Sequence, residues 1–286
     1  MIEELRLLDS KFQKIIVSPI KEKDQDIGYS SIVICNDSAI GGGVSSSEDE
    51  SVKIAIAEFI ERSLFKMISN SDQRQDFLLD EHPTTSGFAA GFDHSKTFLR
   101  ALCEATERWL WSKWIDEGFF VPSISIPLQN MTPLERFFLS HFDSTQFRKM
   151  SITIDHPITG KATAYFAVCL GIKGNGIFPG SRVSFVEDNL WVHPLVEAYR
   201  HLDIFNKRDK DRALADFDFI DQRIIYFGEN KEHALNTIST CKRTDWPKIT
   251  YKLTKEYPTN KQYYLWRVLA DNYKGWHQGC YDRFVY

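Results

Sequence analysis

The chain has 286 residues, of which 43% are hydrophobic, so it can bury the core of one large domain or two small ones. A formal net charge of −4 gives no broad basic surface, which argues against nucleic acid as a partner. The charged N-terminus and the lack of any run long enough for a membrane-spanning helix favour a cytoplasmic protein with no membrane contact. Five widely spread cysteines without C-x-x-C pairing argue against a disulfide framework and a cysteine zinc site.

The first half of the chain is predicted to mix strands and helices. Strands are expected at 14–20 and 31–36, where β-branched residues are frequent. Two helices follow, within similar units at about 38–68 and 84–114. Trp109, Trp111 and Trp114 in the second helix are expected to pack in a core rather than to stack on bases.

The second half is predicted to be richer in strands. A strand pair at 151–155 and 162–172 is expected to join through a turn at 157–160. The segment GNGIFPG is predicted to be a loop, because Gly and Pro punctuate turns, and it does not match a glycine-rich nucleotide motif. Pro194 suits the first turn of a helix that runs towards Phe205. Later strands are expected at 223–227, 249–253 and 263–270.

The domain organisation follows from these elements. No Pro/Ser-rich linker divides the chain. We therefore expect a single α+β domain over residues 1–286, with mixed sheets and a β-rich C-terminal third at about 220–286.

The segment LCEATERWLW places three charged residues in a helix that is otherwise mostly apolar or aromatic. Glu104 and Glu107 are three residues apart and Glu104 and Arg108 four apart, so all three lie on one face. Buried carboxylates are costly unless they are paired or bound to a cation. An internal ion pair between Glu104 and Arg108, with Glu107 at the surface, is the simplest interpretation.

The same pattern occurs earlier, in AIAEFIERSLF. Glu58, Glu61 and Arg62 repeat the three charges at a constant offset, and Gly41 aligns with Gly87 upstream. Both copies therefore predict a strand, a glycine turn and a helix that carries E-x-x-E-R. Four glutamates converging on one cavity would repel one another unless cations lay between them, and oxygen ligands suit Mg²⁺. A Mg²⁺–nucleotide site is one interpretation, and a duplicated structural ion pair is the other.

At this point the sequence resembles the YcaO-domain family. PTTSGFAAGFDHSKTFLRALCEATERW looks like the central signature of that family, a Thr-Ser-Asn-Gly-x-Ala-x-Gly turn before a helix with E-x-x-E-R. GGGVSSSEDESVKIAIAEFIER is similar to its earlier S-x-x-E-x-x-E-R motif, and VHPLVEAYRHL to its later E-x-x-x-Q helix. The resemblance departs from the family at four positions: Ala55 replaces Ser, Ser86 replaces Asn, His201 replaces Gln, and His193 lies where Arg is usual. The chain also ends without the Pro-rich tail of many azoline-forming members.

The resemblance implies an enzyme that uses ATP and Mg²⁺ to activate backbone amides of a ribosomally made peptide. The expected reaction is azoline-forming cyclodehydration at Cys, Ser or Thr. Thioamide formation with an external sulfur donor and a non-catalytic scaffold are the alternatives. The implied partners are the precursor peptide and a leader-binding protein, and a homo-oligomer is compatible with the sequence.

The resemblance also assigns site residues by position. The implied Mg²⁺ ligands are the four repeated glutamates: Glu58, Glu61, Glu104 and Glu107. The implied nucleotide-binding residues come from all three motifs: Arg62, Ser86, Gly87, Arg108, His193, Glu197 and His201. No residue stands out as the general base.

Overall fold

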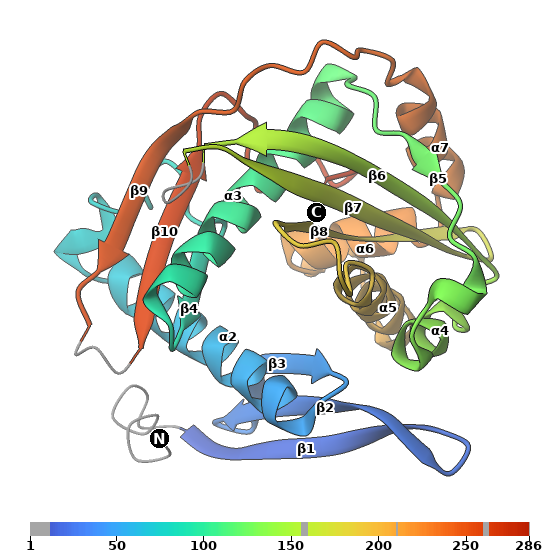
Figure 1. Ribbon diagram of the computed structural model, residues 1–286, viewed down its shortest axis with the longest axis horizontal. Coiled ribbons are helices and arrows are strands. Elements are labelled where there is room, and N and C mark those ends of the chain that lie inside the picture. The colour runs from blue at the N-terminus through green and yellow to red at the C-terminus, as the bar shows by residue number, and fades with distance from the viewer. Residues whose placement is uncertain (1–11, 156–159, 210, 260–262, 286) are drawn as a thin grey trace. The chain divides into compact units, whose positions relative to one another are not determined.

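The computed structural model describes residues 12–155, 160–209, 211–259 and 263–285 (Figure 1). Residue contacts divide the chain into two compact units. The first unit holds residues 1–105 and 251–269, and the second holds residues 106–250 and 270–286. Helices and antiparallel sheets occur together, which confirms the α+β class. The organisation as a single domain stays a prediction.

The first unit begins with an antiparallel sheet of strands β1 (Phe12–Glu22), β2 (Gln25–Cys35) and β3 (Ser38–Ser45). The strand predicted at 14–20 lies within β1, and the one predicted at 31–36 overlaps the end of β2. Helix α2 (Glu48–Ser69) follows β3 and packs against β2 and β3. Three acidic residues in its first turn face the positive end of the helix dipole, which favours a helix start here.

A second sheet of the first unit joins segments that are far apart in the sequence. Strand β4 (Phe88–Gly91) pairs with β10 (Tyr264–Ala270), and β9 (Tyr251–Tyr257) lies on the other side of β10. A short 3₁₀ helix (Asp72–Arg74) precedes β4, and helix α3 (His94–Glu117) follows it. The predicted strand at 263–270 is confirmed, and the one at 249–253 overlaps the start of β9.

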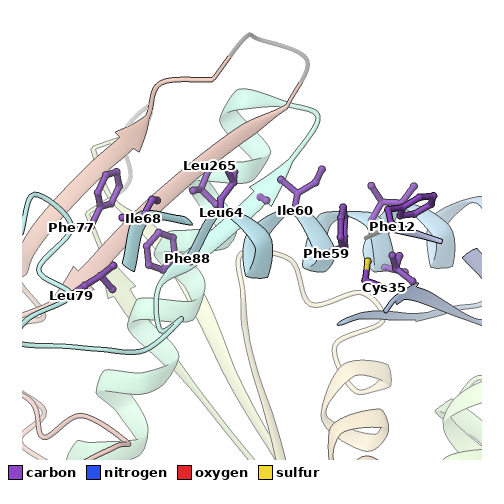
Figure 2. Packing of buried hydrophobic residues seen from close by; sticks show 14 residues of the cluster. Phe12, Cys35, Phe59, Ile60, Leu64, Ile68, Phe77, Leu79, Phe88 and Leu265 are labelled. Atoms are coloured by element: carbon purple, nitrogen blue, oxygen red, sulfur yellow. The ribbon is translucent and has the colours of Figure 1, made fainter. Parts of the chain in front are cut away.

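Helix α2 buries its apolar side against both sheets of the first unit (Figure 2). Its first half meets the β1–β3 sheet, where the rings of Phe12 and Phe59 contact edge to face at 5.9 Å. Its second half carries Leu64 and Ile68 to Phe88 and neighbouring residues of the other sheet. Full burial of each such side chain contributes about 1.5–3 kcal/mol, so this cluster fixes α2 on its two sheets.

The second unit contains a four-stranded antiparallel sheet in the order β5, β6, β7, β8. Its strands are β5 (Ser123–Ile124), β6 (Ser144–Ile154), β7 (Ala162–Lys173) and β8 (Gly176–Ser184). Its helices are α4 (Pro133–Leu139), α5 (Val192–Lys207), α6 (Phe219–Phe227) and α7 (Lys231–Thr240), with short 3₁₀ turns at Leu128–Asn130 and Leu214–Asp216. Helix α5 packs on β8 and β7, and it confirms the helix predicted from Pro194 (Figure 1).

The second unit has an aromatic core around the C-terminal half of α3. Trp109, Trp111 and Trp114 are each at most 1% exposed, which confirms their predicted role in packing. The rings of Trp111 and Trp114 lie 5.0 Å apart, and Phe284 contacts Trp111 edge to face. Phe284, close to the end of the described residues, is therefore part of this core.

One predicted strand of the second unit is a helix in the structure. Residues 223–227, predicted as a strand, lie in helix α6, whose start is capped by Asp218 through the N–H groups of Ile220 and Asp221. The buried Arg223 donates to the carbonyl of Val285 at 2.9 Å. This contact joins residues far apart in the sequence, so no local sequence pattern predicts it. The C-terminal third is therefore not β-rich, since α6 and α7 precede β9 and β10.

The predicted loop GNGIFPG is largely strand β8. Gly174 and Asn175 form the turn after β7, and the strand begins at Gly176. Its glycines serve close packing rather than turning, because a Cβ on Gly180 would lie 2.0 Å from the Pro194 carbonyl oxygen. Pro179 is tolerated because β8 is an edge strand, where an N–H is not needed for pairing. The predicted turn at 157–160 falls mainly outside the described residues.

Two further expectations concern absences. None of the five cysteines, all of which lie in the described residues, forms a disulfide. Within the described part of the chain, no helix combines the length and apolar character needed to cross a membrane.

Candidate functional site

The duplicated unit predicted from the sequence is present in the structure. Each copy is a strand followed by a long helix: β3 and α2 in the first copy, β4 and α3 in the second. Helix α2 begins at Glu48 and α3 at His94, the same offset of 46 residues that relates Glu58 to Glu104. Both strands lie at the edge of their sheets.

In the first copy, the helix binds the backbone of the edge strand. The Gly42 N–H donates to the Glu58 carboxylate at 2.6 Å, and the Arg62 guanidinium donates to the Ile40 carbonyl at 2.8 Å. Glu58 and Arg62 also form an ion pair. We call this arrangement, a glutamate on a strand N–H and a basic residue four positions later on a strand C=O, an edge clamp. Glu58 and Arg62 thus form the ion pair that the structural interpretation expects in the first copy.

A third copy, which the sequence analysis missed, lies in the second unit. The Ser181 N–H donates to the Glu197 carboxylate at 2.7 Å, and His201 Nδ1–H donates to the Pro179 carbonyl at 2.7 Å. Strand β8 and helix α5 therefore carry the same edge clamp as β3 and α2. A common spacing could have revealed it: in each copy a glycine (Gly41, Gly87 or Gly180) precedes the first glutamate by 17 residues.

The glycine of each copy has a steric reason. A Cβ on Gly41 would lie 2.3 Å from the Ala55 carbonyl oxygen of α2, as a Cβ on Gly180 would meet α5. Gly87 has a φ of +73°, and its Cβ would lie 1.7 Å from the Val268 carbonyl oxygen. Only glycine lets the strand backbone approach this closely.

A cluster of like charges lies beside the edge clamp of the first unit. Glu61 is partly buried, and burial together with the nearby Glu104 raises its pKa well above the usual range. Glu58 raises this pKa further, whereas Arg100 and Arg62 lower it. Arg100, which the sequence analysis did not single out, donates to the Ala90 carbonyl at 2.8 Å. Its position four residues before Glu104 was the available signal.

This first-unit cluster therefore gathers three of the four predicted metal ligands: Glu58, Glu61 and Glu104. Carboxylates that raise one another's pKa are stabilised in the ionised form when a cation binds among them. In the described part of the chain, no three acidic, histidine or cysteine side chains already converge at metal-binding distances. The role of these glutamates as Mg²⁺ ligands stays a prediction.

The fourth predicted ligand, Glu107, lies in the second unit and is 7% exposed. Its carboxylate accepts hydrogen bonds from the Ser181 hydroxyl at 2.7 Å and the Val183 N–H at 3.0 Å. The ion-pair interpretation placed Glu107 at the surface, and in this respect it is wrong, because the side chain is buried. Burial raises its pKa, Arg108 lowers it and Glu197 raises it again.

Helix α5 supplies the other second-unit candidates. Burial raises the pKa of Glu197, whereas Arg108, the Ser181 N–H and Arg200 lower it. Burial lowers the pKa of His201 to about 4, so its imidazole is neutral near pH 7 and donates through Nδ1. His193 is exposed in the first turn of the helix. Glu197 and His201 form the second-unit cluster with Glu107 and Arg108.

Ser86 and Gly87 lie in the first unit, in the loop before β4. The Ser86 side chain is 3% exposed, and its hydroxyl has no hydrogen-bond partner among the described residues. Buried hydroxyls are normally satisfied, so this one is available to a bound group. The loop is held by Arg267, which is fully buried and donates to the carbonyls of His82 at 2.7 Å and Thr84 at 3.2 Å.

His201 gives the protein an acid-sensitive element. As pH falls from about 6.5 towards 4, the unfolded chain binds a proton that the folded imidazole does not, so the free energy of unfolding decreases. His201→Gln retains a donor for the Pro179 carbonyl but cannot titrate. Denaturant unfolding should show a smaller loss of stability for this variant than for wild type between about pH 7 and about pH 5. Equal losses would mean that His201 titrates normally in the fold.

Solved structures share this fold. A YcaO from Methanopyrus kandleri bound with AMPPCP and Mg²⁺ matches with a TM-score of 0.53 and 12% identity, over 93% of this chain and 89% of that chain. The E. coli microcin synthetase McbBCD complex with pro-MccB17 bound matches with a TM-score of 0.57 and 12% identity, over 90% and 86%. A heterocyclase in complex with substrate and cofactor matches with a TM-score of 0.54 and 9% identity, over 96% of this chain and 52% of that one.

No protein-family model and no curated protein sequence matches the chain. The structural likeness spans nearly the whole chain at very low identity, so it establishes the fold. The chain has a YcaO-like fold, as the sequence resemblance predicted.

Proposed function

We propose that this chain, whose fold is YcaO-like, uses ATP and Mg²⁺ to activate backbone amides of a ribosomally made peptide. The observation that carries the proposal is the first-unit cluster of Glu58, Glu61 and Glu104. A fold gains no stability from placing a partly buried carboxylate beside two others, and such unfavourable arrangements are typical of functional sites. Mg²⁺ suits the cluster because oxygen ligands suit hard cations.

The residue types fit the two parts of a Mg²⁺–nucleotide. Glu61 and Glu104 would hold Mg²⁺, which neutralises phosphate charge when it is bound. Arg62, which pairs with Glu58 in the first unit, would bind phosphate oxygens. The unpartnered Ser86 hydroxyl would donate to a polar group of the nucleotide. Phosphoryl transfer depends mainly on positioning and charge stabilisation, and these side chains can supply both.

The proposed chemistry removes an amide oxygen as phosphate. A substrate Cys, Ser or Thr heteroatom adds to the preceding amide carbon and loses its proton. The former carbonyl oxygen then takes the γ-phosphoryl group of ATP, which releases ADP. Phosphate leaves with that oxygen as the C=N bond of the azoline forms and the amide nitrogen loses its proton. Ring closure is favoured because the nucleophile is already tethered to the carbon that it attacks. Thioamide formation would use the same activation with an external sulfide as nucleophile.

A second candidate, the non-catalytic scaffold, is favoured by a specific observation. The carboxylates of Glu58, Glu107 and Glu197 all accept hydrogen bonds from strand N–H groups, and this is a sufficient structural reason for their presence. Glu61 and Ser86 have no such structural reason, which is why we prefer the enzyme.

The test is mass spectrometry of a Cys/Ser/Thr-rich peptide encoded beside this chain's gene, incubated with its leader-binding protein, ATP and Mg²⁺. Loss of one water per modified residue is the expected result. The leader-binding protein should raise the yield, because tethering increases the effective concentration of the peptide. Replacement of oxygen by sulfur would instead establish thioamide formation. An unchanged peptide, with no ATP turnover, would favour the scaffold.

A further inference from the structure

The β1–β3 sheet of the first unit has one face that helix α2 does not cover. Helix α2 packs along the other face, where the Ser51 hydroxyl hydrogen-bonds the Ser31 hydroxyl of β2 at 2.7 Å (Figure 1). Successive residues of a strand point to opposite faces, so Ser30 and Ile32, on either side of Ser31, point away from α2. We call the face that carries Ser30 and Ile32 the outer face.

The outer face carries isoleucines that remain accessible. Ile16 of β1 lies directly opposite Ile32 of β2, and these residues are 40% and 37% exposed. Ile20 and Ile34 lie on the same face and are partly buried. An antiparallel sheet with one solvated face normally alternates apolar and polar residues, whereas β2 is apolar on both faces from Ile32 to Cys35. This pattern is typical of a sheet that is packed on both sides.

The outer-face residues of β1 are complementary to the same residues in reverse order. They are Lys14, Ile16, Ser18, Ile20 and Glu22. Ser18 is in the middle, an isoleucine lies two residues away on either side, and opposite charges lie four residues away. Lys14 and Glu22 are both exposed, and neither has an ion-pair partner among the described residues. A second copy with its β1 in the opposite direction would therefore bring each lysine to a glutamate and each isoleucine to an isoleucine.

We infer that the outer face binds a second copy of this chain, related by a two-fold axis that passes near Ser18. The two sheets pack face to face, about 10 Å apart, with their β1 strands in opposite directions. A two-fold interface uses the same patch on both copies, so it requires the self-complementarity that β1 shows, and an unrelated partner would not. Pro19 in the edge strand β1 disfavours joining the two sheets edge to edge, which leaves the faces for contact.

The experiment is sedimentation velocity of the full chain over a range of protein concentrations. Wild type should be a dimer that dissociates on dilution. Ile16→Lys places an ammonium group from each copy in the apolar centre of the interface and should raise the dimer Kd by at least about 100-fold. Val186→Lys is the matched control, because Val186 is an exposed apolar residue of the second unit, and this variant should dimerise as wild type does.

Charge reversal tests the relative direction of the two strands. Lys14→Glu or Glu22→Lys alone replaces two attractive contacts of the dimer by repulsive ones and should raise the Kd about 10-fold. The double variant restores opposite charges and should dimerise nearly as wild type does. Within one copy the two positions are about 27 Å apart along the strand, so such a rescue requires contact between copies.

Two results would overturn the inference. One is a chain that is monomeric at every concentration. The other is a dimer that Ile16→Lys and both charge reversals leave unchanged, because that dimer would use another surface. If circular dichroism shows that Ile16→Lys does not fold, the charge reversals at exposed positions decide. The inference does not depend on the proposed function, since the first-unit cluster lies within a single copy.

Discussion

Replacing Glu61 by glutamine is expected to weaken Mg²⁺-dependent ATP binding by at least about 100-fold while leaving the fold intact. Loss of a group that merely orients a metal ligand costs about 10–100-fold, and loss of a ligand should cost no less. Glutamine keeps the shape of the side chain and removes the charge that Mg²⁺ requires. Calorimetric titration of ATP with Mg²⁺ measures the effect.

The same substitution should raise the stability of the ligand-free protein near neutral pH. Because burial and Glu104 raise the pKa of Glu61, the folded state holds the proton of Glu61 to a higher pH than the unfolded chain does. Above this raised pKa, ionised Glu61 lowers the free energy of unfolding; below the ordinary pKa both states are protonated and the cost disappears. Glu61→Gln should therefore exceed wild type in stability at high pH and approach it in acid.

Two further variants serve as controls. Glu50→Gln, at an exposed position in the first turn of the same helix, should leave ATP binding unchanged. Glu58→Ala removes the edge clamp on Gly42 and should lower the free energy of unfolding by about 1–3 kcal/mol. A destabilised Glu61→Gln protein that still binds ATP would show that Glu61 is structural.

Gly87→Ala is expected to unfold the protein or to destabilise it by more than about 4 kcal/mol. The substitution has two costs. A φ of +73° is unfavourable for a residue with a side chain, by about 1–2 kcal/mol. The new Cβ would also lie 1.7 Å from the Val268 carbonyl oxygen, so the strand β10 would have to move. Thermal and denaturant unfolding measure the loss.

Gly118→Ala is the matched control for this prediction. Gly118 has a nearly identical φ of +74°, but a Cβ there would have nothing within 4 Å. Gly118→Ala should therefore lower the free energy of unfolding by only about 1–2 kcal/mol, the cost of a side chain at this φ. Equal losses for the two variants would mean that close approach at Gly87 contributes nothing.

The sequence predicts the repeated strand–helix units well, because their signals are local. Glycine spacing, apolar periodicity and E-x-x-E-R recur at one offset, and the helices α2 and α3 start in register. The third copy escaped detection because Arg200 and His201 replace the Glu and Arg of the motif, and because glycine and proline in β8 are typical of a loop. These residues instead reflect close packing against α5.

Other features depend on contacts that no local pattern encodes. Arg267 holds the loop before β4 through carbonyls that are far away in the sequence, and Arg223 holds the C-terminal segment in the same way. The proximity of Glu61 to Glu104 requires that two helices, α2 and α3, present their charges to each other. The sequence identifies each glutamate as a candidate ligand, but only the fold shows that the Glu107 carboxylate accepts a hydrogen bond from strand β8.

The most direct test of the central claim is equilibrium binding of ATP to the purified chain, measured with Mg²⁺ and again with the metal chelated. Binding that requires Mg²⁺ and is lost in Glu61→Gln is the predicted result. Absence of binding with Mg²⁺, or binding that is unaffected by chelation and by Glu61→Gln, would contradict the assignment of the first-unit cluster to Mg²⁺–ATP.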